Sequence, residues 1–238
     1  MAGARAAARE RTRAAILAAA RQQIATHGGV GLSMRAVARE SGLVSSAVYR
    51  YFETREALLT AMIVESYGNL DAALAAAADP PHGEYPANTW RALARALRGW
   101  GRAVPHEFQL LYGTPVPGYV APPETIPAAT AVGTHFLRSG AGRDVPGFDG
   151  ADLRAQMADL AAEVGGVEPA GAAAVLAELA ALVGFVTLEL AGHFVGTADP
   201  ADPLFDALVE RQVVTLGLAA ERSGTLPAEP PGDDSAPA

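Results

Sequence analysis

The sequence contains no cysteine and no lysine. The absence of cysteine excludes disulfides, thiolate metal ligands and a thiol nucleophile. Aromatic residues make up only 6% of the chain and runs of β-branched residues are short, which argues against a β-sandwich or a β-barrel. No apolar run reaches about 18 residues, so we expect no membrane span. The first residues are charged and lack the apolar core of a signal peptide, and we therefore expect a cytoplasmic protein.

The chain is long enough and apolar enough to form a core. Its 238 residues correspond to one domain, or to one domain and a small appendage, and 50% of them are hydrophobic. The most frequent residue is alanine, which favours helix more than it drives burial. These features predict an all-α protein.

Charge is distributed unevenly along the chain. All 18 basic residues are arginines, and the net charge is −8. Residues 1–55 contain nine arginines and three acidic residues, whereas residues 56–238 contain nine arginines and 23 acidic residues. A basic head on an acidic body indicates that the head binds an anionic partner. Charge alone leaves open that the basic segment has no partner.

Apolar residues recur with helical spacing through most of the chain, and no segment has a convincing strand pattern. The predicted helices cover residues 10–27, 34–40, 45–51, 55–78, 89–104, 105–113, 124–139, 151–164, 168–196 and 204–222. Thr54 caps the fourth of them, and Asp79 with the two prolines after it ends that helix. We expect residues 1–9 to form a loose arm and residues 223–238 to form a disordered tail.

Residues 33–52 have the pattern of a helix-turn-helix motif. Two short helices are joined by a turn at Gly42, where glycine accepts a left-handed backbone at low cost. The apolar positions that face inward in this arrangement are Leu32, Val37, Leu43, Val48 and Phe52. The second helix then turns small and basic residues outward, where they fit a DNA groove and reach base edges and phosphates.

Residues 10–70 resemble the DNA-binding domain of the tetracycline-repressor (TetR) family of transcriptional regulators. The residues that carry the resemblance are Ile16, Ala19, Ala20, Gly28, Gly29, Ser33, Met34, Arg35, Val37, Ala38, Gly42, the run Ala47-Val48-Tyr49-Arg50-Tyr51-Phe52 and the run Arg55-Glu56-Ala57-Leu58-Leu59. An ordinary helical hairpin does not require Tyr49, Tyr51 and Arg55 at these spacings, so the pattern indicates more than amphipathicity.

Three residues depart from the family pattern. Val44 stands where the family has a polar capping residue, and because valine does not cap, we expect the next helix to begin one residue later. Tyr51 replaces a frequent histidine, and Arg55 replaces the usual lysine. Both replacements still donate to phosphate, and arginine does so with two hydrogen bonds.

The resemblance implies which residues contact DNA. Those expected at phosphates are Ser33, Arg35, Tyr49, Tyr51, Thr54 and Arg55. Those expected to face the major groove are Ser45, Ser46, Ala47 and Arg50. Arg50 is best suited to a guanine, whereas Tyr49 also fits a partly buried packing position. The arm adds Arg5, Arg9, Arg11 and Arg13, for which solvated charge is the simpler interpretation and contact with DNA the alternative.

Residues 71–222 contain no motif as specific as that of the head. The resemblance implies a helical ligand-binding and dimerisation domain in which the last two helices, 168–196 and 204–222, form the dimer interface. The candidate interface residues are Val175, Leu179, Leu182, Val186, Leu208, Val209, Val213 and Leu216. The same apolar faces fit the core of a single subunit, and both interpretations remain open. Two heads about 34–36 Å apart would bind a near-palindromic double-stranded DNA operator.

The resemblance also implies a cavity in the body for an unidentified small-molecule effector. Such a cavity is apolar with few polar groups, and the candidate lining residues are Trp90, Leu93, Leu97, Trp100, Phe108, Leu111, Tyr112, Tyr119, Phe136, Phe185, Glu189 and His193. Each aromatic residue alone fits the core better than a ligand wall. Residues 105–123 and 184–197 resemble a type of body found in actinobacterial members of the family.

The sequence predicts no metal, cofactor or catalytic site. Glu189 and His193 share a helix face at a spacing of four, but no third ligand accompanies them. Neither a glycine-rich phosphate loop nor a serine elbow nor a pair of carboxylates stands out. We therefore expect a homodimeric DNA-binding regulator, most simply a repressor that a small apolar or amphipathic ligand releases. The alternative is a helical ligand-binding protein or an enzyme whose basic head is incidental.

Overall fold

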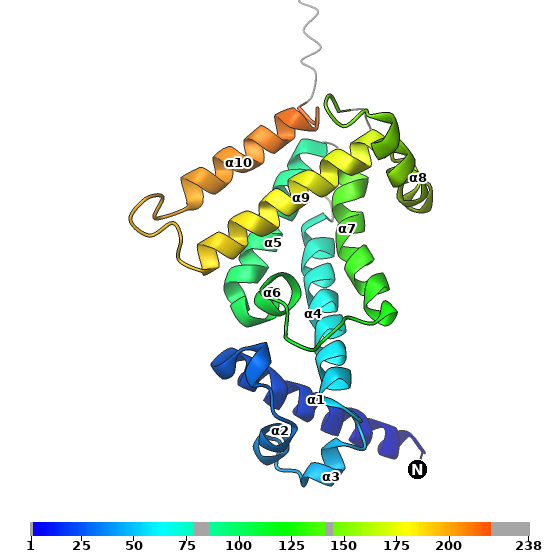
Figure 1. Ribbon diagram of the computed structural model, residues 1–238, viewed down its shortest axis with the longest axis vertical. Helices are drawn as coiled ribbons and strands as arrows, with labels where there is room; N and C mark the ends of the chain where they lie inside the picture. The colour runs from blue at the N-terminus through cyan, green and yellow to red at the C-terminus, as the bar shows by residue number, and fades with distance from the viewer. Residues whose placement is uncertain (1, 79–85, 141–144, 220–238) are drawn as a thin grey trace, which may run out of the picture.

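The computed structural model describes residues 2–78, 86–140 and 145–219, and all regular elements in these ranges are helices (Figure 1). In chain order they are α1 (Ala2–His27), η1 (Gly29–Gly31), α2 (Met34–Glu40), α3 (Ser45–Val48), α4 (Arg55–Ala78), α5 (Pro86–Ala103), α6 (Pro105–Tyr112), η2 (Pro123–Thr125), α7 (Ile126–Gly140), α8 (Ala151–Val164), α9 (Pro169–Leu190) and α10 (Asp202–Thr215). The predicted all-α fold is confirmed.

The molecule is elongated and has two hydrophobic cores. Helices α1, α2 and α3 form a head at the lower end of Figure 1, and α5 to α10 form a body above it. Helix α4 runs from one into the other, because its first half contributes Leu58, Leu59 and Met62 to the head core and its second half contributes Leu70 and Leu74 to the body core. One continuous helix therefore connects the two parts.

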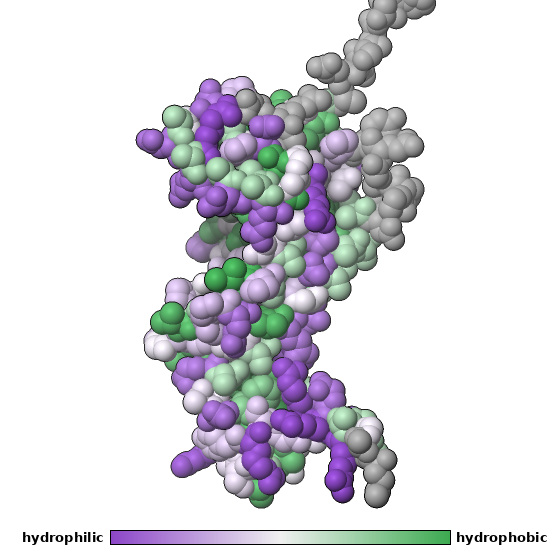
Figure 2. Space-filling model, turned by 90° about the vertical axis from the view of Figure 1, so that its right-hand side faces the viewer, coloured by the Kyte–Doolittle hydropathy of each residue, from purple (hydrophilic) through white to green (hydrophobic). Residues whose placement is uncertain are grey.

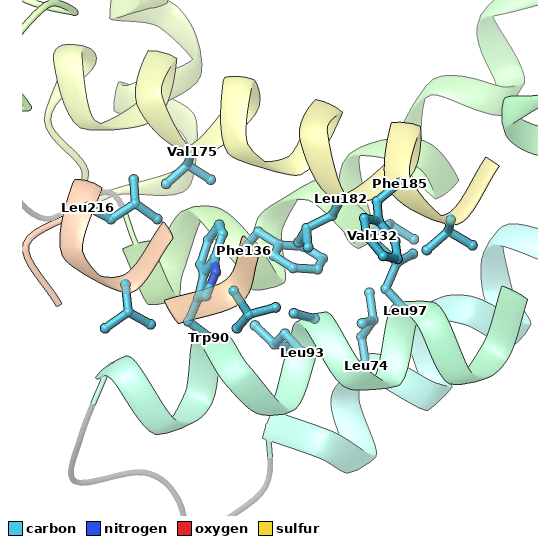
Figure 3. Close-up of a cluster of buried hydrophobic side chains, with 14 of the residues drawn as sticks. Leu74, Trp90, Leu93, Leu97, Val132, Phe136, Val175, Leu182, Phe185 and Leu216 are labelled. Atoms are coloured by element: carbon cyan, nitrogen blue, oxygen red, sulfur yellow. The ribbon is translucent and has the colours of Figure 1, made fainter. Parts of the chain in front are cut away.

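Side chains from α5, α7 and α9 converge in the centre of the body (Figure 3). The rings of Trp90 and Phe136 pack edge to face with their centroids 5.4 Å apart. The indole nitrogen of Trp90 donates a 3.1 Å hydrogen bond to the Gln212 side chain, which in turn donates to the backbone carbonyl of Glu178 at 2.8 Å. Gln212 is fully buried, so this chain satisfies its polar groups and fixes α10 against α5 and α9.

Much of the predicted effector cavity and of the predicted dimer interface is part of this core instead. The residues predicted for the cavity that are buried in the core instead are Trp90, Leu93, Leu97, Phe108, Phe136 and Phe185. The residues predicted for the dimer interface that are buried there are Val175, Leu182, Val186, Val209, Val213 and Leu216. Helical spacing identifies an apolar face but not what covers it, and here the subunit's own helices cover these faces. Leu179 and Leu208 are half-buried against the same core.

Several predicted boundaries are also wrong. Helix α1 begins at Ala2, so the expected loose arm is helical from residue 2 to residue 9. Helix α3 ends at Val48, three residues before the predicted end. Helix α9 ends at Leu190 because Gly192 adopts a left-handed backbone with φ of 77°, which leaves His193 outside the helix. The predicted tail at residues 223–238 and the break at residues 79–81 lie outside the described residues.

Helix α9 is the most hydrophobic helix of the body. Its 22 residues are long and apolar enough to cross a membrane by length and composition, and the mean hydropathy of its most apolar stretch is 2.0. Half of that stretch is buried inside the protein, including the carboxylate-bearing Glu178. The packing of α9 against α5, α7 and α8 accounts for this composition as that of a core helix.

Candidate nucleic-acid interface and effector cavity

The turn between α2 and α3 has the geometry that the sequence predicts. Gly42 adopts φ of 70°, and the backbone nitrogen of Leu43 donates to the Ala38 carbonyl at 2.8 Å. Val37 and Val48 are fully buried on either side of this turn, so the two helices close onto the head core. The arrangement fixes the direction in which α3 leaves the head.

A glutamine on α1 holds both ends of α2. The Gln23 side chain is 4% exposed; its amide nitrogen donates to Glu40 at 3.0 Å, and its oxygen accepts from the backbone nitrogen of Ser33 at 3.1 Å. Ser33 is the residue before α2; it is exposed and makes no side-chain capping bond. The sequence gives no local signal for Gln23, because its partners lie 10 and 17 residues away.

Helix α3 exposes most of the side chains predicted to contact DNA. It begins at Ser45 with Val44 in the N-cap position and without a side-chain capping bond, so the predicted delay of one residue is wrong. Ser46, Arg50 and Tyr49 are exposed, and Tyr49 is 46% exposed. Ala47 is only 7% exposed and packs toward the head, so its predicted position in the groove is wrong. We call residues 45–50 the recognition segment.

Thr54 and Arg55 both make contacts that stabilise the head, and Thr54 is exposed as well. The Thr54 hydroxyl accepts from the backbone nitrogen of Ala57 at 3.0 Å, which confirms the predicted cap of α4. The Arg55 guanidinium donates to the backbone carbonyls of Gly29 at 2.6 Å and Leu32 at 3.0 Å. These bonds tie the start of α4 to the turn after α1. The predicted phosphate contact of Arg55 is therefore corrected to an internal one.

Two hollows share residues 113–116 as part of their walls. The first, which we call the effector cavity, has a volume of about 400 Å³ and lies between α4, α6 and α7. Its lining residues are Leu59, Ile63, Tyr67, Leu110, Leu111, Gly113, Thr114, Pro115, Val116, Tyr119, Ala121, Thr125, Ile126, Ala129 and Thr130. The second, which we call the head cleft, has a volume of about 650 Å³ and is lined by head residues 28–30 together with residues of α6 and α9.

The effector cavity has an uncharged wall. None of its lining residues is acidic, basic or histidine. Burial raises the pKa of the Tyr67 phenol above its ordinary value, so this group stays neutral at physiological pH. Burial, with the nearby Tyr67, also raises the pKa of Tyr112, which lines the head cleft. Of the twelve residues predicted to line the cavity, only Leu111 and Tyr119 do so.

Glu189 and His193 take positions other than those predicted for them. The Glu189 carboxylate accepts two hydrogen bonds from the Arg98 guanidinium, at 2.6 Å and 2.8 Å. His193 is exposed in the turn after α9. Trp100 is half-buried and packs against Phe108 at a centroid distance of 6.4 Å. No group of three or more potential metal-ligating side chains occurs within residues 2–78, 86–140 and 145–219.

The wall between the two hollows contacts the head directly. A side-chain carbon placed on Gly29 would lie 2.7 Å from Val116, so glycine permits a close approach between the turn after α1 and this wall. Tyr119 and Thr60 of α4 share a 2.9 Å hydrogen bond between their hydroxyls. The wall therefore touches the head at Gly29, and Tyr119, three residues after the wall, contacts α4.

An ionic cluster provides a second connection between head and body. The Arg21 guanidinium of α1 lies 2.6 Å from a carboxylate oxygen of Glu65 in α4 and 3.3 Å from one of Glu107 in α6. The Ser66 hydroxyl donates to Glu107 at 2.8 Å. Helix α6 also lines both hollows, so the same helix touches the effector cavity and the head. Glu107 is 41 residues from its hydroxyl partner, which is why sequence patterns do not reveal this cluster.

Apolar side chains are exposed on the outer faces of α9 and α10. Leu176 and Leu188 on α9 and Leu204 and Val214 on α10 are exposed, and Val214 is 72% exposed. Arg211 crosses between the two helices and donates to the buried carboxylate of Glu178 at 2.8 Å. We call this surface the outer face. It lies on the opposite side of α9 and α10 from the buried residues of the predicted interface.

A helix-turn-helix head with an exposed recognition segment, joined by one helix to a hollow helical body, defines a DNA-binding transcriptional regulator. Residues 16–62 match the family described as "Bacterial regulatory proteins, tetR family", and residues 90–212 match "Tetracyclin repressor-like, C-terminal domain". The chain belongs to the TetR family of transcriptional regulators.

Relatives from actinobacteria agree with this assignment. The HTH-type transcriptional regulators Rv1816 of Mycobacterium tuberculosis and Mb1846 of Mycobacterium bovis are each 45% identical over 141 residues, which is 57% of this chain and 58% of theirs. The match thus spans somewhat more than half the length of these curated relatives. The crystal structure of the regulatory protein SCO4313 is 30% identical with a TM-score of 0.72, over 87% of this chain and 97% of that one. A TetR-like regulator from Rhodococcus sp. RHA1, 19% identical with a TM-score of 0.52 over 85% of this chain and 96% of that one, has the same fold.

Proposed function

We propose that the protein is a cytoplasmic homodimeric repressor that binds near-palindromic DNA and leaves it when a neutral, mainly apolar ligand enters the effector cavity. The observation that carries this proposal is the exposure of Ser46, Tyr49 and Arg50 on a recognition segment whose other side is buried in the head. Residues 10–70 act as the DNA-binding domain in this proposal, and residues 71–222 act as the ligand-binding and dimerisation domain.

The outer face supports dimerisation. Leu204, Ala207, Arg211 and Val214 recur every three or four residues along α10, so they form a stripe that the subunit itself leaves uncovered. Exposed apolar surface of this kind marks a protein–protein interface. A second copy covering this stripe buries it and holds two heads together. Two heads then bind two half-sites about 34–36 Å apart.

The lining of the effector cavity supports an uncharged ligand. A charged ligand would be desolvated there without a counter-charge, which is costly in free energy. The hydroxyls of Thr114, Thr130 and Tyr67 line the cavity and offer hydrogen bonds to a carbonyl or hydroxyl of the ligand. The remaining lining is mostly aliphatic, so apolar contact provides most of the affinity.

The wall of residues 113–116 supports a route from ligand to DNA. A ligand that fills the effector cavity pushes this wall toward the head cleft, where the structure has room for it. Val116 and Tyr119 then shift against Gly29 and Thr60, and α6 shifts Glu107 against Arg21. The ligand releases DNA only if it binds this shifted arrangement more tightly than the DNA-bound one.

Arg50→Ala tests the recognition segment. We expect a loss of about 1–3 kcal/mol in DNA-binding free energy and a relaxed preference at one position of each half-site, because a guanidinium pairs with guanine by two hydrogen bonds. The measurement is fluorescence anisotropy on duplexes that the wild-type protein selects from a random library, at 50 to 200 mM salt. Arg138→Ala, an exposed arginine on α7, is the matched control. Wild-type protein without salt-dependent duplex binding would refute the proposed function.

Ala129→Phe tests the effector cavity. The substitution adds a phenyl ring to a lining residue on α7, so we expect the affinity for the neutral apolar dye Nile red to fall at least tenfold. The control Ala128→Phe is one residue earlier on α7, at a position that does not line the cavity. Nile red fluorescence is measured as each variant is added, and thermal melting checks that the two variants are equally stable. Equal dye affinity in the two variants would place ligand binding elsewhere.

A further inference from the structure

The N-terminal end of α1 carries three arginines on one side. Arg5, Arg9 and Arg13 are four residues apart, so successive side chains rotate by about 40° around a helix of 3.6 residues per turn and the three lie within an arc of about 80°. We call these three residues the arginine row. Arg11 is two residues from Arg9 and points about 200° away from it. The helix therefore has an arginine face and, for comparison, one arginine off that face.

The arginine row lies beside the recognition segment. The Arg9 guanidinium carbon is 5.9 Å from the centre of the Tyr51 ring, and that of Arg13 is 5.7 Å from the centre of the Phe52 ring. Tyr51 and Phe52 follow the recognition segment directly. Figure 1 shows the N-terminal end of α1 passing the foot of α4 close to α3. Arg5 extends the row by about 6 Å, since a helix rises about 1.5 Å per residue.

Carboxylates of the described residues neutralise little of the positive charge of the arginine row. Arg5 and Arg9 are exposed, and within the described parts of the chain neither lies in ion-pair distance of a carboxylate. Arg13 approaches Glu10 only at 3.9 Å, and the two side chains are 41% and 73% exposed. Figure 2 shows hydrophilic side chains at the lower end of the molecule, around this end of α1. Alanines alone separate Arg5 from Arg9, so this part of the helix can lie close to another surface.

We propose that the arginine row binds backbone phosphates of the DNA that flanks each half-site, as a rigid extension of the recognition segment. This inference rests on the proposed function, because it takes the same duplex as the partner. Guanidinium groups pair with phosphate in a bidentate manner, and the positive end of the α1 dipole adds to the attraction. Phosphate contacts carry no sequence information, so the row contributes affinity and salt dependence but no base preference.

The test compares Arg5→Ala and Arg9→Ala with Arg11→Ala, which removes the same charge from the same helix but from another face. Alanine is the best helix former, so α1 persists in all three variants, and circular dichroism checks this. The probe is a duplex selected by the wild-type dimer, used once with ten arbitrary base pairs on either side and once trimmed to the half-sites.

We expect Arg5→Ala and Arg9→Ala each to lower the slope of log affinity against log salt by about two per dimer, since each removes one phosphate contact per subunit. We expect Arg11→Ala to lower the slope by less than half as much as Arg5→Ala or Arg9→Ala does. Hydroxyl-radical protection of the outer flanks disappears in the row variants, base preference stays the same, and trimming the flanks weakens wild type but not the double variant Arg5→Ala/Arg9→Ala.

Equal effects of all three substitutions would overturn the inference, because they would show diffuse charge rather than a row of contacts. Unchanged flank protection in the double variant would overturn it as well. Both outcomes leave the proposed function standing, provided that Arg50→Ala relaxes base preference. An absence of salt-dependent duplex binding by the wild-type protein would overturn both.

Discussion

Replacing Arg98 with alanine is expected to destabilise the folded protein by about 3–5 kcal/mol, because it leaves a carboxylate in the body without its partner. Arg98 is 7% exposed and donates to Glu189 and, at 3.1 Å, to Asp202. Its guanidinium carbon also lies 4.6 Å from the centre of the Phe205 ring. The hydrogen bonds that Arg98 donates to Glu189 raise the pKa of Arg98 above its ordinary value although burial opposes this, so the cation persists.

The neighbouring Arg95 provides the matched control. It lies on the same helix, one turn earlier, but its side chain is 60% exposed and its partner Asp206 is 3.5 Å away. Such an exposed pair contributes about 0–1 kcal/mol, so Arg95→Ala should leave the free energy of unfolding nearly unchanged. Urea denaturation followed by circular dichroism measures both variants. Equal stabilities for Arg95→Ala and Arg98→Ala would show that burial does not increase the contribution of the Arg98 cluster to the free energy of unfolding.

The double variant Arg98→Met/Glu189→Met separates charge from packing. Replacing both members of a buried ion pair by apolar residues of similar size often restores stability, because no unpaired charge remains. We therefore expect the double variant to be more stable than Arg98→Ala by at least about 2 kcal/mol. A double variant that is as unstable as the single one would indicate that aromatic packing of Arg98 on Phe205, rather than the charge, holds α5 against α10.

The head follows closely from its sequence because its signals are local. Gly42 adopts the left-handed backbone that the turn requires, and Thr54 caps α4. Each of these effects depends on residues within a few positions of one another. The contacts that secure the head, from Gln23 to Glu40 and from Arg55 to Gly29, join residues 17 and 26 positions apart and leave no periodic trace.

Two of the wrong predictions concern α1 and α9. Residues 2–9 have no apolar face, which suggests a loose arm, but alanine and arginine both have high helix propensity and simply continue α1. Helix α9 is apolar on all sides, so its periodicity does not say which side faces the core. The structure buries Val175, Leu182 and Val186 and exposes Leu176 and Leu188. Contacts with residues far away in the sequence determine which side of α9 is buried.

Val214→Glu is expected to separate the proposed dimer into monomers that still fold. Val214 is 72% exposed in the single subunit, so a carboxylate there remains hydrated in the monomer. In a dimer that covers the outer face, the same carboxylate loses its water without gaining a counter-charge, at a cost of several kcal/mol. Because the symmetric interface contains the substitution twice, we expect the dissociation constant of the dimer to rise at least about a hundredfold.

Loss of the dimer should also weaken DNA binding. Two linked heads gain about 10²–10⁴-fold in affinity over one head through effective concentration, so Val214→Glu should lose most of that gain although its recognition segment is intact. Sedimentation velocity measures the oligomeric state, and anisotropy on the selected duplex measures affinity. Ala75→Glu, at an exposed position of α4 away from the outer face, is the control and should stay dimeric. A Val214→Glu protein that remains a dimer with wild-type DNA affinity would show that the subunits associate through a different surface.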